Sequence, residues 1–133
     1  MREILFRGKR RDNGEWVYGN YAFTDSNGKQ HFIFQNIAFE YLVIPETIGQ
    51  YTGLTDKNGR EIFEGDIVID KYSKEKFGFV GVVIYNPKLT QFQIYSDKQP
   101  GYVVNLGGRA QSVKVLGNIH DNPELVKGDT NDA

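Results

Sequence analysis

The densest group of side chains that could do chemistry lies in the middle of the chain. Four carboxylates fall within a short segment, and they belong to Asp56, Glu61, Glu64 and Asp66. Carboxylates so close together can act as a general acid and a general base, or as oxygen ligands of a cation. Aspartate also accepts hydrogen bonds from backbone amides in tight turns. We therefore expect Asp56 and Asp66 to bond turns, and the alternative is a carboxylate cation or hydrolytic site at 56–66.

The other residues that could do chemistry lack the partners of known sites. His31 and His120 are far apart in the sequence, and neither has a neighbour at metal-ligand spacing. Gly107 and Gly108 precede Arg109, but the helix that completes a phosphate-binding loop is not indicated. The chain has no cysteine and none of the common nucleophile or nucleotide-binding motifs. We therefore expect a protein that is not an enzyme, with no catalytic residues, no metal and no cofactor.

A third group combines positive charge with aromatic side chains near the N-terminus. Basic residues outnumber acids there, and three large aromatic residues follow. Single-stranded nucleic acids stack their bases on aromatic rings while basic groups follow the phosphates, so the pattern is compatible with that function. The interaction candidates are Arg7, Lys9, Arg10, Arg11, Trp16, Tyr18 and Tyr21.

The overall charge makes nucleic acid the second choice. Lys and Arg total 16 and Asp and Glu total 17, for a net charge of −1, so counter-ion release would involve only a few phosphates. A strand edge protected by Lys and Arg explains the same basic residues. Amphipathic aromatics are enriched in protein interfaces, and aromatic residues make up 14% of this chain. We expect protein–protein binding between copies of the chain as a homo-oligomer, with single-stranded nucleic-acid binding as the alternative.

The elements that must position these residues are mainly β-strands. Abundant aromatic residues and 15 glycines favour strands and tight turns over helices. Alternation predicts a strand at 16–23 with a bulge near Gly19 and Asn20. A second strand, with Phe32 and Phe34 on one face, is expected at 29–34 after an Asn–Gly hairpin signal. Further alternation at 37–43 favours another strand, and a helical or irregular turn follows near 46–48.

Short strands at regular spacing are expected in the second half of the chain. Their predicted ranges are 67–69, 78–85, 92–95, 102–104 and 113–118. Asn122 is the expected N-cap of a helical turn that begins at Pro123. The predicted fold is mainly β, with few short helical turns. N-terminal β-hairpins (1–48) pack on a C-terminal small SH3-like barrel that carries a short tail (49–133).

Three segments of the sequence resemble the YopX family of phage and prophage proteins. The central segment, residues 50–68, is QYTGLTDKNGREIFEGDIV. The opening REILFR at 2–7 and the closing VLGNIHDNPEL at 115–125 agree with it. The resemblance covers essentially the whole chain, and 15–48 and 71–112 match only loosely. It implies a phage or prophage accessory protein whose family has no assigned activity and no established catalytic residues.

The resemblance also bears on partners and location. It implies a protein that works in the cytoplasm of the host cell, where an unidentified phage or host protein is a further expected partner. The apolar stretches of the sequence are too short to span a bilayer, so no membrane partner is expected. The glycines and aspartates of the shared central segment are the residue types that shape turns, which makes this segment a folding signature.

Overall fold

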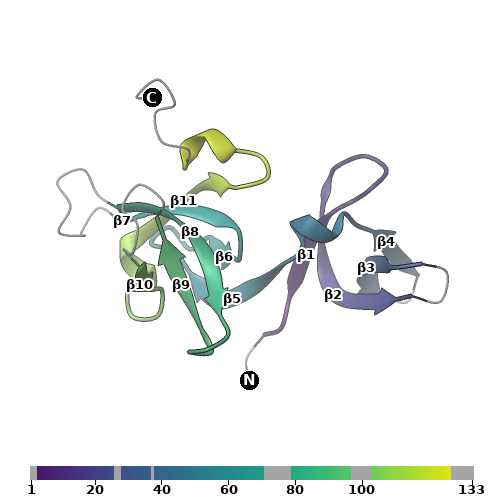
Figure 1. The fold of residues 1–133 in the computed structure, drawn as a ribbon, viewed down its shortest axis with the longest axis horizontal. Coiled ribbons are helices and arrows are strands. Elements are labelled where there is room, and N and C mark those ends of the chain that lie inside the picture. The colour runs from purple at the N-terminus through teal and green to yellow at the C-terminus, as the bar shows by residue number, and fades with distance from the viewer. Residues whose placement is uncertain (1–2, 26–27, 37, 71–78, 97–102, 127–133) are drawn as a thin grey trace. The chain divides into compact units, whose positions relative to one another are not determined.

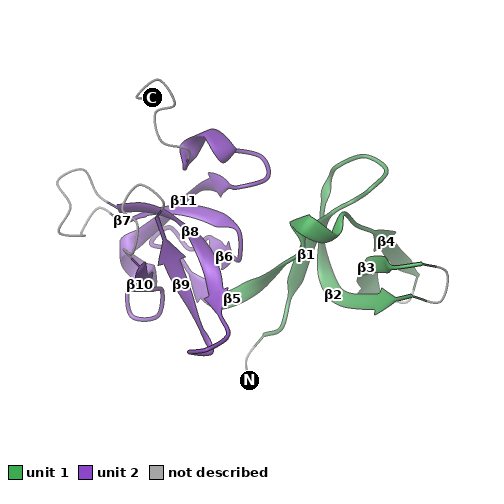
Figure 2. Cartoon of the chain, in the orientation of Figure 1, with its two compact units in different colours: residues 1–53 green, residues 54–133 purple. Residues whose placement is uncertain are grey.

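The computed structural model of the protein describes residues 3–25, 28–36, 38–70, 79–96 and 103–126. It is mainly β, as the sequence predicts (Figure 1). The chain divides into two compact units, residues 1–53 and 54–133 (Figure 2). The boundary expected from the sequence, between residues 48 and 49, comes earlier than this division. The reason is that β5 (Gly49–Thr55) pairs with the first strand of the chain before it enters the second unit.

The first unit is an antiparallel arrangement of consecutive strands. They are β1 (Phe6–Lys9), β2 (Trp16–Thr24), β3 (Gln30–Asn36) and β4 (Phe39–Leu42), followed by the 3-10 turn η1 (Pro45–Thr47). The strand order of the sheet is β4-β3-β2-β1-β5-β6, in which β6 (Glu61–Phe63) belongs to the second unit. The amide of Arg11 donates to the carbonyl of Leu42 at 3.0 Å, and the amide of Ile44 donates to the carbonyl of Lys9 at 2.8 Å. The end of β4 is therefore bonded back to the end of β1, which closes the four strands.

The closed strands surround a small aliphatic core. Val17, Ile33 and Val43 are buried there, and Phe6 and Tyr41 pack against them. Successive side chains of a strand point to opposite faces. The neighbours of Val17 and Ile33 along β2 and β3 therefore point outward, and most of them are aromatic.

Strand β2 changes its pairing partner in mid-strand. Residues 16–19 pair with β1 and residues 20–24 pair with β3, in each case without a register shift. The predicted bulge near Gly19 and Asn20 is therefore wrong. The break in alternation marks the change of partner, where β3 lies so close that a Cβ on Gly19 would clash with the carbonyl oxygen of Phe34.

The second unit contains a five-stranded antiparallel sheet. The elements of the unit are β6 (Glu61–Phe63), β7 (Asp66–Asp70), β8 (Phe79–Asn86), β9 (Gln91–Tyr95), β10 (Val103–Asn105), η2 (Ala110–Ser112), β11 (Val113–Asn118) and η3 (Pro123–Leu125). The sheet order is β10-β9-β8-β7-β11, and the core residues include Ile62, Val68 and Ile94. This is a small β domain, whose SH3-like topology stays a prediction. Residues 37, 78 and 102 of the predicted strands and residues 127–133 at the end of the chain lie outside the described residues.

Asp56 connects the turn before β6 to β11. Its Oδ1 accepts hydrogen bonds from the amides of Asn58 at 2.8 Å and Arg60 at 2.9 Å, and its Oδ2 accepts one from the amide of Val115 at 2.9 Å. Burial acts to raise the pKa of Asp56, but the three amides and the charge of Arg60 outweigh it and hold this pKa below the ordinary value of 3.8. The prediction that Asp56 is a turn-bonding acid is confirmed.

Acid is expected to weaken the second unit through Asp56. Because the pKa of Asp56 is lower in the folded state, its contribution to stability is complete above the ordinary value of 3.8 and is lost as pH falls through the folded-state pKa. Urea denaturation at a series of pH values from 7 down to 2 measures this dependence. The free energy of unfolding of the wild type should fall more steeply below pH 4 than that of Asp56→Asn, and parallel curves would contradict the assignment.

The last turn is capped differently from the expectation. Asn122 precedes η3 and Pro123 opens it, as predicted, but the Asn122 side chain makes no capping hydrogen bond. Its Oδ1 instead accepts a hydrogen bond from the amide of Asn118 at 3.2 Å. Gly117 makes this possible, because a Cβ there would occupy the position of the Asn122 carboxamide.

Candidate protein-binding surface

The seven predicted interaction residues lie on β1, on β2 and in the turn between them, all within the first unit. The register places Arg7 opposite Tyr18 and Lys9 opposite Trp16. Residues directly opposite each other in an antiparallel pair share one face of the sheet. These four side chains therefore lie together on the outer face, away from the buried Val17.

Trp16 holds the two cations of β1. The guanidinium carbon of Arg7 lies 4.7 Å from the centroid of the indole ring, and the ammonium nitrogen of Lys9 lies 5.5 Å from it. Both distances are within the range of cation–π attraction. Arg7 is also only 5% exposed. These two contacts thus hold the side chains of β1 against β2. The Trp16 ring is already in contact with two cations of its own chain.

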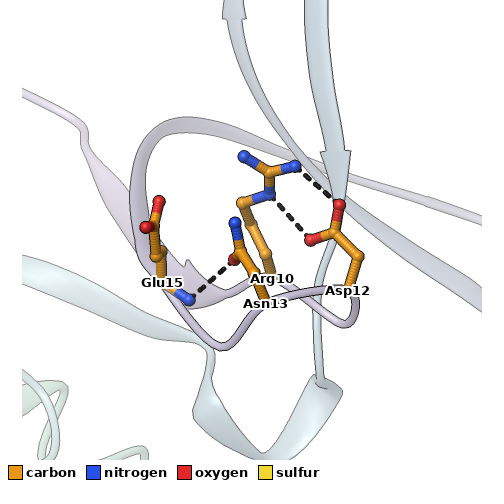
Figure 3. Close-up of polar contacts among 4 residues, drawn as sticks. All are labelled: Arg10, Asp12, Asn13 and Glu15. Carbon is orange, nitrogen blue, oxygen red and sulfur yellow. Dashed lines mark hydrogen bonds and ion pairs between the residues drawn. The ribbon is translucent and has the colours of Figure 1, made fainter.

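The turn after β1 engages a third cation. Arg10 donates from Nε and Nη2 to the two carboxylate oxygens of Asp12, at 2.9 and 2.6 Å (Figure 3). Its guanidinium carbon lies 4.5 Å from the centroid of the Tyr41 ring. The hydrogen bond between Arg10 and Asp12 is the main cause that raises the pKa of Arg10 and lowers the pKa of Asp12. The amide of Glu15 donates to Oδ1 of Asn13 at 2.9 Å and shapes the same turn (Figure 3).

A cavity of about 340 Å³ opens beside this turn. Its lining residues are Arg10, Arg11, Asp12, Glu40, Tyr41 and Leu42. Arg11 is exposed at the surface, so it is the predicted cation that is most open to a partner. Two basic and two acidic side chains line the cavity together. A lining of mixed sign is poorly suited to a polyanion.

Beyond Trp16 the outer face carries several large apolar side chains beside the exposed Asn20 and Glu40. Phe34 lies opposite Asn20, and Phe32 lies opposite both Ala22 and Leu42. The rings of Phe32 and Phe34 are 6.4 Å apart and inclined by only 20°. We define the outer aromatic face as Trp16, Tyr18, Phe32, Phe34 and Leu42. Within it, Tyr18 is 43% and Leu42 36% exposed.

Three members of the outer aromatic face were not among the predicted site residues. The sequence places Phe32 and Phe34 on one face of a strand, and that expectation is confirmed. The sequence does not show which strands flank β3. The pairing of β3 with β4 brings Phe32 opposite Leu42, and its pairing with β2 brings Phe32 opposite Ala22. The alternation of aromatic residues at 32–34, taken together with the alternation at 16–18, is the sequence signal that could have identified this face.

Tyr21 lies on the other face of the sheet, apart from Trp16 and Tyr18. Its hydroxyl is 2.7 Å from Nδ1 of His31, and the two rings are stacked with centroids 5.9 Å apart. The Phe23 ring lies 4.9 Å from His31. Tyr21 and Phe23 are 37% and 49% exposed. The structure thus separates Tyr21 from the candidates on the outer face, and the hairpin of β2 and β3 presents aromatic groups on both sides.

The acidic segment is engaged with the backbone. Besides the three bonds of Asp56, Oδ2 of Asp66 accepts a hydrogen bond from the amide of Phe63 at 2.8 Å. This bond spans the tight turn in which Gly65 has a φ of 88°. Glu61 is exposed and Glu64 is half-buried. Among the residues that the structure describes, no three or more histidine, aspartate or glutamate side chains are grouped so that they could hold a metal ion.

Comparisons with known proteins identify a family and a similar solved structure. The family model described as YopX protein matches residues 5–127. The crystal structure of protein EF1440 from Enterococcus faecalis is similar to this chain, with 27% sequence identity and a TM-score of 0.58, and the match covers 96% of this chain and 100% of that one. None of the curated proteins matches the chain. Within the described ranges, no helix is long and apolar enough to cross a membrane.

Proposed function

The chain belongs to the YopX family, and from this premise and the outer aromatic face we propose that it is a non-enzymatic phage or prophage accessory protein that acts by binding. Its first partner is a second copy of itself, and its place of action is the cytoplasm of the host cell. A further phage or host protein is then recognised by the homo-oligomer.

The observation that carries this proposal is the composition of the outer aromatic face. Phe32, Phe34 and Leu42 adjoin one another across β3 and β4, and Tyr18 continues the face on β2. Contiguous exposed apolar surface on a soluble protein commonly marks an interaction site. Aromatic residues dominate the energetically important centres of protein interfaces.

The charges beside this face are complementary to each other. Lys9 lies on the outer face at β1, and Glu40 lies on the same face at β4, opposite Phe34. In a twofold symmetric dimer every contact occurs twice, so if Lys9 of one copy meets Glu40 of the second, Glu40 of the first also meets Lys9 of the second. An antiparallel stacking of two outer faces would therefore bring Lys9 of each copy toward Glu40 of the other, around a centre of aromatic side chains.

Nucleic-acid binding has less support than self-association. Arg7 and Lys9 lie on the Trp16 ring, and Arg10 is paired with Asp12. The guanidinium of Arg10 has to leave the Asp12 carboxylate before it binds phosphate. The ring of Trp16, the strongest stacking platform of the candidate set, already carries two charges of its own unit.

Light scattering coupled to size-exclusion chromatography tests the proposal. We expect the wild type to have the mass of a dimer at micromolar concentration. The double variant Tyr18→Glu with Leu42→Glu places charges in the apolar centre, and its dimer dissociation constant should rise by about thirtyfold or more. Both side chains are exposed, so the fold should persist.

The matched control is Leu89→Glu, which changes an apolar side chain of 56% exposure in the second unit. It should leave the dimer intact. A wild type that stays monomeric over the whole concentration range contradicts the proposal. Salt-dependent binding of a single-stranded oligonucleotide that is lost in Lys9→Ala with Arg11→Ala would favour the nucleic-acid alternative instead.

A further inference from the structure

A second cavity, of about 420 Å³, lies at the edge of the second unit's sheet. It is lined by Val103, Val104 and Asn105 of β10 and by Gly107, Gly108 and Arg109 of the turn that follows. The glycine pair before Arg109 is a conspicuous feature of the sequence, but the pattern alone does not predict a phosphate site there. The structure gives the turn a different context, because it places a charged residue and an edge strand around one hollow.

Arg109 is held in place by a buried carboxylate. Its Nη1 donates to Oδ2 of Asp70 at 2.9 Å, and Asp70 is 1% exposed. The hydroxyl oxygen of Ser112 lies 2.8 Å from the carbonyl oxygen of Arg109 and 3.3 Å from Oδ1 of Asp70, so its one hydrogen is shared between these two acceptors. The Arg109 side chain is nevertheless 37% exposed. One nitrogen, Nη1, therefore anchors the guanidinium, while the side chain stays accessible to solvent.

The turn adds backbone donors to the guanidinium. The amide of Arg109 donates to the carbonyl of Leu106 at 3.1 Å, and Gly108 has a φ of 85°. Within the described part of the chain, the amides of Gly107 and Gly108 donate no hydrogen bond. Successive amides in a turn of this kind form a concave site for an anion. The residues that carry this guanidinium and these two amides all line the cavity, so we expect the three groups to act together on one negatively charged ligand.

The charge balance limits which anion fits. Asp70 already neutralises Arg109, and among the residues that the structure describes no other basic residue lines the cavity. A phosphate dianion would find too little positive charge, whereas a monoanionic carboxylate needs mainly hydrogen bonds. The planar fork of arginine matches a carboxylate group especially well.

The strand beside the cavity indicates what carries the carboxylate. Within the part of the chain that the structure describes, β10 ends the sheet and pairs only with β9. Its outer edge therefore offers backbone donors and acceptors to another strand. Val103 is 39% exposed. We propose that this cavity binds the C-terminal carboxylate of an extended peptide segment of a partner protein, which adds as a strand to the outer edge of β10.

The experiment follows backbone amide resonances of the full-length protein by NMR during titration. The probes are an N-acetylated pentapeptide that ends in a free valine carboxylate, its C-terminal carboxamide, and inorganic phosphate. We expect the free acid at millimolar concentration to shift the amides of Gly107, Gly108 and the β10 residues. The carboxamide should bind about tenfold more weakly or worse, because it lacks the charge-assisted hydrogen bonds.

Two variants separate the role of Arg109 from the stability of the fold. Arg109→Gln should abolish the peptide-induced shifts, but it also leaves the buried Asp70 without its ion pair. Gly107→Glu keeps that ion pair and has open space around its Cβ, and its carboxylate should weaken binding by about tenfold or more. Tyr18→Glu with Leu42→Glu should bind as the wild type does, because the described residues that line this cavity all belong to the second unit.

Three outcomes would overturn the inference. Equal binding of the acid and the carboxamide would show that the carboxylate is not recognised. Saturable shifts with phosphate and none with the peptide would identify a phosphate site. The absence of shifts at Gly107 and Gly108 with the peptide at millimolar concentration would leave the cavity without the assigned ligand.

Discussion

Replacing Asp56 by alanine is expected to lower the free energy of unfolding by about 4 kcal/mol. The carboxylate accepts hydrogen bonds from the amides of Asn58, Arg60 and Val115. A buried amide without an acceptor costs about 1–3 kcal/mol. The loss is largest at Val115, which is 4% exposed and lies in the core of the second unit. Asp56 is the link that bonds the turn before β6 to β11.

Urea denaturation followed by far-UV circular dichroism measures this effect. Asp56→Asn should cost less than Asp56→Ala, because the carboxamide oxygen still accepts the bonds of the turn while its NH2 group opposes the amide of Val115. Glu61→Ala is the matched control, since Glu61 belongs to the same acidic segment and is exposed. If Asp56→Ala costs no more than Glu61→Ala, the structural role of this carboxylate is wrong.

The fold class and the role of Asp56 could be read from the sequence because both depend on local chemistry. Glycines and aspartates at short spacing specify turns, and aromatic and β-branched residues specify strands. Asp56 uses one oxygen on the amide of Asn58, two residues away, which is the pattern of an Asx turn. Its second oxygen bonds Val115, far along the chain, and no local pattern indicates that contact.

The surface of the first unit was predictable only in part, because it depends on which strands are neighbours. The sequence identifies Arg7, Lys9 and Trp16 as a basic and aromatic group, but it does not show that the cations lie on the indole ring. It likewise groups Tyr21 with Tyr18, although the two lie three residues apart on one strand and face opposite sides. A β-bulge at Gly19 and a change of pairing partner there produce the same break in the alternation of large residues along the sequence.

The cavity at Arg109 also depends on contacts between residues that are distant in the sequence. A glycine pair before an arginine suggested a phosphate loop, and the lack of a following helix argued against it. The features that matter for the proposed ligand are the buried Asp70 and the outer edge of β10. Asp70 is distant from Arg109 in the sequence, so only the tertiary fold makes this arginine a candidate for carboxylate recognition.

Gly19→Ala is expected to destabilise the first unit by about 3 kcal/mol or more. A Cβ at this position would clash with the carbonyl oxygen of Phe34 and would lie 2.8 Å from its carbonyl carbon. The obstacle is backbone and not the end of a flexible side chain, so relief requires β3 to move away from β2. That movement would break the pairing that starts at Asn20 and Phe34, and with it the outer aromatic face.

A matched substitution distinguishes this clash from a general effect of alanine. Gly107→Ala also adds one methyl group, but no atom of the described residues lies within 4 Å of its Cβ, and reduced freedom of the unfolded chain should make it neutral or slightly stabilising. Urea denaturation gives the two free energies, and amide hydrogen exchange in β2 and β3 locates the loss. Because the dimer proposed above depends on the same strands, Gly19→Ala should also dissociate it, whereas Gly107→Ala should not. An alanine at position 19 that costs less than about 1 kcal/mol would show that β2 and β3 do not approach so closely.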